Sequence, residues 1–278
     1  MYKTILVHVD DTVRSAERVK AAGRLAAKYE AHLVGAATTG LAEYLIPIGG
    51  LDGGMPAIVF PIEELRAEAD RALCKFQSTA ESAGVHAFER RLIDDEASVG
   101  ISLHARYSDL VVISRHVADE FMPRLRSDFP EYVLLNCARP VLVLPPHSPA
   151  GDIGRSVTVA WNGSPEAVRA ITSAIPLLKR AHQVNLVVFN ADKDPELHGD
   201  EPGADIALYL ARHGVRVKVS AIRADCDEGE ALLTFAANKH ADLIVMGAFG
   251  HSRLREFVLG GMSRAMLASS PIALWMAH

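Results

Sequence analysis

The sequence has few of the features that identify membrane, disulfide-rich or nucleic-acid-binding proteins. No apolar run approaches the roughly 18 residues needed to span a bilayer, and no secretory pattern follows Met1. The 278 residues include only three cysteines, too scattered for a disulfide framework or a C-x-x-C metal site. The formal net charge is −5, with both signs interspersed, so no basic surface favours nucleic acid. We therefore expect a soluble cytoplasmic protein with neither a nucleic-acid nor a membrane partner.

The common catalytic signatures are missing as well. The sequence contains no G-x-x-x-x-G-K-[ST] loop of a P-loop ATPase, no H-E-x-x-H metal motif and no G-x-S-x-G nucleophile turn. Its twelve histidines are dispersed. We assign no catalytic residue and no metal ligand from the sequence. Cys74 and Cys137 fall within predicted helices, where we expect them to be buried packing residues.

Predicted strands and helices alternate along the first half of the chain. Runs rich in β-branched residues predict strands at residues 4–9, 31–37, 86–93, 109–113 and 140–144. Apolar residues at helical spacing predict helices at about 12–30, 61–83, 96–106 and 127–138, with a long loop at 38–60. This alternation predicts a parallel sheet with helices on both faces.

The same order of elements begins again after the proline-rich stretch at 145–151. Strands are predicted at 156–161, 184–189, 215–219, 241–246 and 272–276, and helices at 164–181, 204–213, 229–239 and 262–269. Asn162 and Ser164 stand 152 residues after Asp10 and Thr12 in the matching turn. We infer an internal duplication. The prediction is two tandem doubly wound α/β domains with five-stranded parallel sheets, at residues 1–146 and 156–278, joined by a linker at 147–155.

The stretch at 246–263, M-G-A-F-G-H-S-R-L-R-E-F-V-L-G-G-M-S, is a predicted phosphate cradle. Its glycines follow a buried strand and precede a helix start, where backbone N–H groups and the helix dipole favour an anion. Each such contact is worth about 0.3–1 kcal/mol, whereas micromolar binding requires about 8 kcal/mol. Burial of a base must therefore contribute. The first half has no glycine between Gly100 and the linker, so we expect it to be a structural copy.

This stretch resembles the G-x2-G-x9-G-[ST] ATP motif of the universal stress protein family, with Gly247-Ala-Phe-Gly250, nine residues, and then Gly260-Gly261-Met262-Ser263. I-L-V-H-V-D at 5–10 resembles the first strand of the family and its ligand-side aspartate. The resemblance extends over nearly the whole chain, as two tandem copies. It implies a Rossmann-like, adenine nucleotide alpha hydrolase-like fold for each copy.

The resemblance also implies a set of binding residues in the second copy. Phosphate-contacting glycines fall on Gly250, Gly260 and Gly261, and the hydroxyl of Ser263 is a further phosphate ligand. Two positions depart from the family pattern: Gly261 replaces a hydroxyl residue, and Asn162 replaces the acid near the adenosine. Trp161 either stacks on the base or fills the core. The expected nucleotide-binding residues are Ala160, Trp161, Asn162, Phe189, Met246, Gly247, Gly250, Gly260, Gly261, Met262 and Ser263.

Three functions remain open from the sequence. The first is a stress-response protein that binds ATP, ADP or AMP, with or without Mg²⁺, and acts in signalling rather than catalysis. The second is a slow ATP-hydrolysing or phosphate-transferring enzyme that uses a metal held by the nucleotide and by Asp225 or Asp227. The third is a scaffold that has lost nucleotide binding. The resemblance further implies an intramolecular pseudo-dimer in which strands 141–144 and 272–276 meet, and it leaves a homodimer open.

Overall fold

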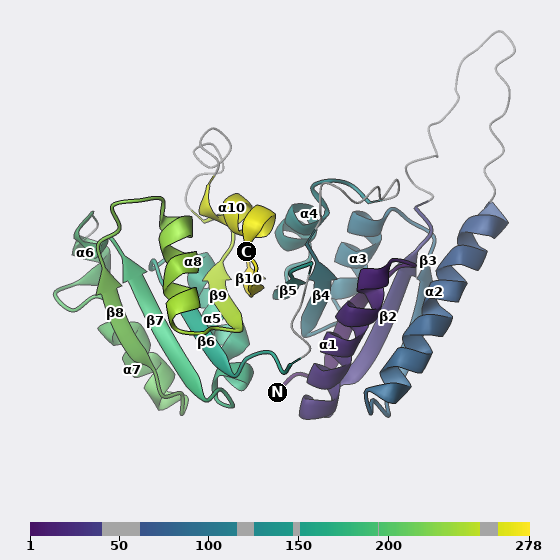
Figure 1. Ribbon diagram of the computed structural model, residues 1–278, viewed down its shortest axis with the longest axis horizontal. Helices are drawn as coiled ribbons and strands as arrows, with labels where there is room; N and C mark the ends of the chain where they lie inside the picture. The colour runs from purple at the N-terminus through teal and green to yellow at the C-terminus, as the bar shows by residue number, and fades with distance from the viewer. Residues whose placement is uncertain (41–61, 116–124, 147–150, 194, 251–260) are drawn as a thin grey trace, which may run out of the picture.

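A computed structural model describes residues 1–40, 62–115, 125–146, 151–193, 195–250 and 261–278. Ten strands form one sheet in the order β3-β2-β1-β4-β5-β10-β9-β6-β7-β8. The two halves of this sheet carry their own helices and stand side by side, with the C-terminus between them (Figure 1). Each half is a doubly wound five-stranded parallel sheet, as the alternation of elements predicts.

The first domain follows the predicted order closely. Its elements are β1 Thr4–Val9, α1 Val13–Tyr29, β2 His32–Thr38, α2 Ile62–Ser82, β3 Phe88–Ile93, α3 Ala97–Ala105, β4 Leu110–Ser114, α4 Phe129–Asn136 and β5 Val141–Leu144. Alternate residues of β1 face opposite sides of the sheet, because successive strand side chains point in opposite directions. Ile5 and Val7 join the core beneath α1 and α2, whereas Leu6 joins the core beneath α3 and α4.

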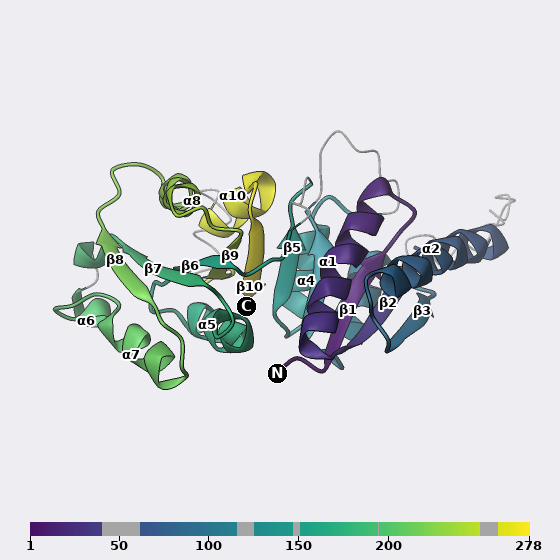
Figure 2. The same cartoon turned by 60° about the horizontal axis from the view of Figure 1, so that its bottom comes forward.

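The second domain repeats this plan with short additional helices. Its elements are β6 Ser156–Ala160, α5 Pro165–Leu178, β7 Gln183–Phe189, η2 Ala191–Lys193, α6 Pro195–His198, α7 Ala204–Arg212, β8 Lys218–Ile222, α8 Glu228–Asn238, β9 Leu243–Gly247, α10 Met262–Ser269 and β10 Ala273–Ala277. In Figure 2, α8 and α10 lie on one face of the sheet, and α5 and α7 lie on the other. Between residues 190 and 203, where the sequence predicts no strand or helix, the structure contains η2 and α6.

Two further expectations need correction. The third strand of the second domain begins at Lys218 rather than at residue 215. Gly214 has a positive φ of 79°, and the N–H of Val215 donates to Leu210 O at 3.0 Å, so Val215 is buried against the helix end instead of extending the strand. Cys74 is exposed, although Cys137 is buried as expected. Cys74 lies just outside the buried stripe of α2, which includes Leu73 and Phe76.

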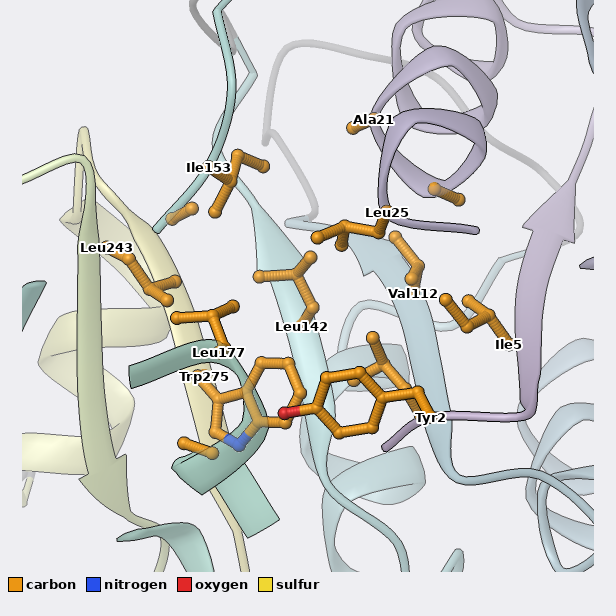
Figure 3. Packing of buried hydrophobic residues seen from close by; sticks show 14 of the residues in the cluster. Tyr2, Ile5, Ala21, Leu25, Val112, Leu142, Ile153, Leu177, Leu243 and Trp275 are labelled. Atoms are coloured by element: carbon orange, nitrogen blue, oxygen red, sulfur yellow. The ribbon is translucent and has the colours of Figure 1, made fainter. Parts of the chain in front are cut away.

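The fifth strands of the two domains pair antiparallel at the centre of the sheet, as expected. Leu142 lies opposite Trp275, whose side chain is fully buried. Figure 3 shows Trp275 beside Tyr2, and their ring centroids are 5.5 Å apart. Both side chains donate to Ser173 of α5: Tyr2 Oη to its carbonyl at 2.8 Å and Trp275 Nε1 to its hydroxyl at 3.0 Å. The two domains therefore share one core.

None of the helices in the described ranges is long and apolar enough to cross a membrane.

Candidate functional site

A cavity of about 560 Å³ opens in the second domain, where β6, β7 and β9 end and α5, α8 and α10 begin. β6 and β9 are neighbours, and the chain leaves them in opposite directions across the sheet. Such a switch point is where open α/β sheets bind ligands, because the loops on either side of it separate. The lining residues are Ala160, Trp161, Asn162, Ser164, Val187, Phe189, Asp227, Glu228, Met246, Gly247, Gly250, Gly261, Met262 and Ser263.

The structure brings together the residues that the sequence nominated for binding. All of them line the cavity except Gly260, which lies outside the described residues. Sequence reasoning missed Val187 and Glu228 and did not place Ser164 or Asp227 at the wall. Val187 could have been found, since it stands two residues before Phe189 on the same strand face. Asp225, the other acid considered for a metal, is not among the lining residues.

One wall of the cavity is the turn between β6 and α5. The Asn162 side-chain oxygen accepts from the N–H of Ser164 at 3.2 Å and from its hydroxyl at 2.8 Å. The Ser164 hydroxyl oxygen in turn accepts from Ala167 N–H at 3.1 Å and caps α5. In the first domain, the carboxylate of Asp10 accepts from Thr12 N–H at 3.0 Å in the same way. The amide of Asn162 therefore keeps the shape of this turn without its negative charge.

Trp161 follows the end of β6 and is partly buried. Its backbone N–H donates to Val187 O at 3.0 Å. Its side chain packs against the core on the α5 side of the sheet and also lines the cavity. Both roles considered from the sequence are thus compatible with its position. On the other face of the sheet, the lining residues Ala160, Phe189 and Met262 pack against the second core cluster.

The first two glycines of the motif have different surroundings. A Cβ at Gly247 would lie 2.6 Å from the backbone N of Ala167, so β9 approaches the start of α5 more closely than any other residue would allow. A Cβ at Gly250 would meet only side chains, at 2.8 Å from Glu166 Oε2 and 3.4 Å from Ser164 Oγ. Gly247 is therefore required by the packing of strand against helix, whereas a Cβ at Gly250 would meet side chains that can move aside.

The turn after β9 is held by Ser263. Phe249 has a positive φ of 54°, which is uncommon for a residue with a side chain. Its N–H donates to Ser263 Oγ at 2.9 Å. Ser263 is buried and belongs to the first turn of α10, so this bond ties the glycine turn to the start of the helix. The Ser263 hydroxyl still has its own hydrogen to donate toward the cavity.

Three helix N-termini meet the cavity, and their capping differs. Ser164 caps α5, and Asp227 caps α8 by accepting from Gly229 N–H at 2.9 Å and Glu230 N–H at 3.2 Å. α10 begins after Gly261, which has no side chain, and among the described residues no side chain caps it. The first N–H groups of a helix have no partner within the helix, so an uncapped N-terminus offers donors and a positive dipole end to an anion.

The matching place in the first domain is occupied by a buried ion-pair cluster. Arg18 is 2% exposed; its guanidinium donates to Asp10 Oδ2 at 2.8 Å and to Ser114 Oγ at 2.9 Å. It also donates to the carbonyl oxygen of His8, whose ring lies 5.0 Å from that of Phe129. In the second domain the positions of His8 and Arg18 are held by Ala160 and Ala170. Large polar side chains thus replace the small residues that leave the second cavity open.

The electrostatics of this cluster follow from its burial. Burial and the Arg18 guanidinium lower the pKa of His8 to about 4, so the imidazole is neutral at pH 7. Burial acts to raise the pKa of Asp10, but Arg18 and the hydrogen bonds from Thr12 act against it and hold that pKa well below its usual range. The Asp10 carboxylate therefore already has a cationic partner inside the protein.

The described residues contain no group of three or more His, Cys, Asp and Glu side chains arranged to hold a metal ion.

Comparisons with known proteins agree with the two-domain fold. A model of the universal stress protein family matches residues 1–145 and again residues 154–278. A universal stress protein from Archaeoglobus fulgidus DSM 4304 is similar in structure, with a TM-score of 0.74 and 19% identity over 99% of this chain and 95% of that one. A functionally unknown protein from Pseudomonas aeruginosa PAO1 has a TM-score of 0.62 and 12% identity over 99% of this chain and 92% of its own.

A universal stress protein in complex with cAMP covers 52% of this chain and 98% of its own, at 22% identity and a TM-score of 0.36. At these identities the likenesses to solved structures establish the fold alone. A search of curated proteins finds no match.

Proposed function

This chain belongs to the universal stress protein family, and we propose that its second domain binds an adenine nucleotide, ATP, ADP or AMP, with or without Mg²⁺. We propose a signalling or regulatory role in a cytoplasmic stress response rather than a catalytic one. The observation that carries the proposal is the N-terminus of α10, which no described side chain caps, at one end of an open, partly apolar cavity.

The dimensions and chemistry of the cavity support this ligand. Its volume of about 560 Å³ lies within the range of roughly 300–1,000 Å³ for small-molecule sites. Ala160, Phe189 and Met246 offer an apolar wall for a base, and Gly250 and Ser263 lie beside the helix start, where phosphates fit. The phosphate contacts supply only part of the ~8 kcal/mol needed for micromolar affinity, so burial of the base supplies the rest.

Isothermal titration calorimetry with ATP, ADP and AMP tests the proposal. We expect Ala160→Leu to weaken binding by at least about tenfold, because three added carbon atoms project from the wall into the space for the base. Ala237→Leu makes the same chemical change on the exposed side of α8 and should bind as the wild type does. Failure of all three nucleotides to bind the wild type at millimolar concentration would contradict the proposal and favour a scaffold.

An enzymatic role is a weaker candidate. Asp227 lines the cavity, but its Oδ1 accepts two backbone hydrogen bonds as the cap of α8. We expect phosphate release from ATP and Mg²⁺ to stay at the level of a buffer blank. Turnover that is lost in Asp227→Asn while ATP still binds would favour the enzyme.

A further inference from the structure

A carboxylate is held at the cavity wall by a buried amide. Asn190, 6% exposed, directly follows β7, and its side-chain oxygen accepts from Ala224 N–H at 3.0 Å. A backbone N–H can only donate, so this bond fixes which end of the amide is the oxygen. Its nitrogen, Nδ2, then donates to Glu228 Oε1 at 2.7 Å. Glu228 is the first residue of α8 and lines the cavity.

The backbone of Asn190 supports the same arrangement. Its φ is 51°, a left-handed conformation that asparagine adopts more readily than most residues. Its N–H donates to Ile222 O at 2.9 Å, so this one residue connects the ends of β7 and β8 to the start of α8. Lys193 Nζ also approaches Glu228 Oε1, at 4.0 Å. A carboxylate has about four acceptor positions, so Glu228 retains capacity to accept from a ligand.

The described part of the first domain has no equivalent of this pair. The residue after β2 is Thr39, and the first residue of α3 is Ala97, both buried. There, Glu96 accepts from the N–H groups of Ser98 and Val99 and serves only its own helix. The Asn190–Glu228 pair thus belongs to the domain with the open cavity, as the glycine motif does.

The place of Glu228 in the cavity indicates which part of a nucleotide it meets. Asn190 follows β7, next to Phe189, whereas Gly247 ends β9 and Gly250 follows it, two strands away in the sheet order. Neighbouring strands are about 4.8 Å apart, so the two strand ends are separated by roughly 10 Å. A carboxylate repels phosphates and accepts from neutral donors. A nucleoside offers such donors in its ribose hydroxyls and in the amino group of adenine.

We propose that Glu228 accepts a hydrogen bond from the nucleoside part of the ligand, from a ribose hydroxyl or the base amino group, and that Asn190 is its positioning residue. This rests on the proposed nucleotide binding. In a Glu228→Gln variant, the side-chain oxygen stays with Asn190 Nδ2, so an NH₂ group replaces the charged acceptor at the cavity. The ligand donor then loses its partner while the helix and the cavity shape are kept.

Affinities of four ligands test the inference: ATP, 2′-deoxy-ATP, 3′-deoxy-ATP and the triphosphate of purine riboside, which lacks the 6-amino group. We expect the wild type to bind one of the analogues about tenfold or more weakly than ATP, as for a hydrogen bond to a charged group. The analogue that loses affinity identifies the donor. In Glu228→Gln that analogue and ATP should bind within about twofold of each other, because the interaction is already lost.

Two further variants separate positioning from a general effect of charge. Glu230→Gln removes a carboxylate from the same turn of α8, outside the lining of the cavity, and should keep the full discrimination. Asn190→Gly tolerates the positive φ but removes the amide, so discrimination should fall while ATP still binds.

Equal binding of all four ligands to the wild type, or equal loss of discrimination in Glu230→Gln, overturns this inference and leaves the proposed function intact. If ATP itself does not bind, both fail.

Discussion

Gly247 should prove to be required for packing rather than for ligand contact, and Gly247→Ala tests this directly. The added Cβ would lie 2.6 Å from Ala167 N and 2.8 Å from the carbonyl carbon of Glu166, both backbone atoms at the start of α5. Non-bonded carbon contacts are normally about 3.5–4.0 Å long, so α5 and β9 must separate by roughly 1 Å. The strand cannot turn the added Cβ aside, because β9 is paired on both sides with β6 and β10.

The expected cost follows from these contacts. Overpacking a core costs about 1–3 kcal/mol, and the smaller entropy of unfolded alanine relative to glycine returns about 0.4–1 kcal/mol. We therefore expect the free energy of unfolding of Gly247→Ala to fall by ~1–2 kcal/mol. Gly250→Ala is the matched control, because its nearest contact is the end of the flexible Glu166 side chain. It should lose less than about 0.5 kcal/mol.

Urea unfolding, followed by circular dichroism, measures both variants against the wild type. A lower urea midpoint, with an unchanged slope of the unfolding free energy against urea concentration, reports a loss of stability without a change in the surface exposed on unfolding. A Gly247→Ala protein as stable as the wild type, or one no less stable than Gly250→Ala, would refute the argument from strand–helix contact.

Three further predictions concern the cores and the thiols. The stability difference between wild type and His8→Gln, measured by urea unfolding, should shrink by about 2 kcal/mol from pH 7 to pH 5. In the unfolded protein, His8 takes up a proton once the pH falls below its usual pKa of 6.5, whereas in the folded protein its pKa of about 4 keeps it neutral at pH 5. A stability difference that does not change between pH 7 and pH 5 would contradict the burial argument. Trp275→Ala should cost about 3–5 kcal/mol by the same unfolding assay, since the fully buried indole joins both domains, and a loss below about 1 kcal/mol would argue against a shared core. In the native protein, a chromogenic thiol reagent should react with exposed Cys74 and Cys226 well before Cys137, because burial raises the pKa of the Cys137 thiol to about 11. Equal reaction rates of the three thiols would contradict this expectation.

Local sequence patterns were sufficient for the elements that bury a continuous apolar face. The runs at 4–9, 110–113 and 156–160 are strands because most of their side chains are buried on both faces of a parallel sheet. The prediction failed at the third strand of the second domain, where alternating valines at 215–219 suggested a strand. The N–H of Val215 was used by the preceding helix, and alternation alone cannot reveal that competition.

The sequence by itself determined the duplication and the glycine motif found in only one half, because spacing and composition along the chain record these features. The meeting of the two fifth strands was expected only from the family resemblance, and the tertiary structure shows it. The tertiary structure decided which residues share the cavity. Asp227 and Glu228 reach its wall only because β8 lies beside β7, so that α8 begins near the end of β7. It likewise showed that Arg18 occupies the matching region of the first domain. Such contacts join residues that are far apart in the chain, and their proximity depends on strand order and helix placement, which no local pattern encodes.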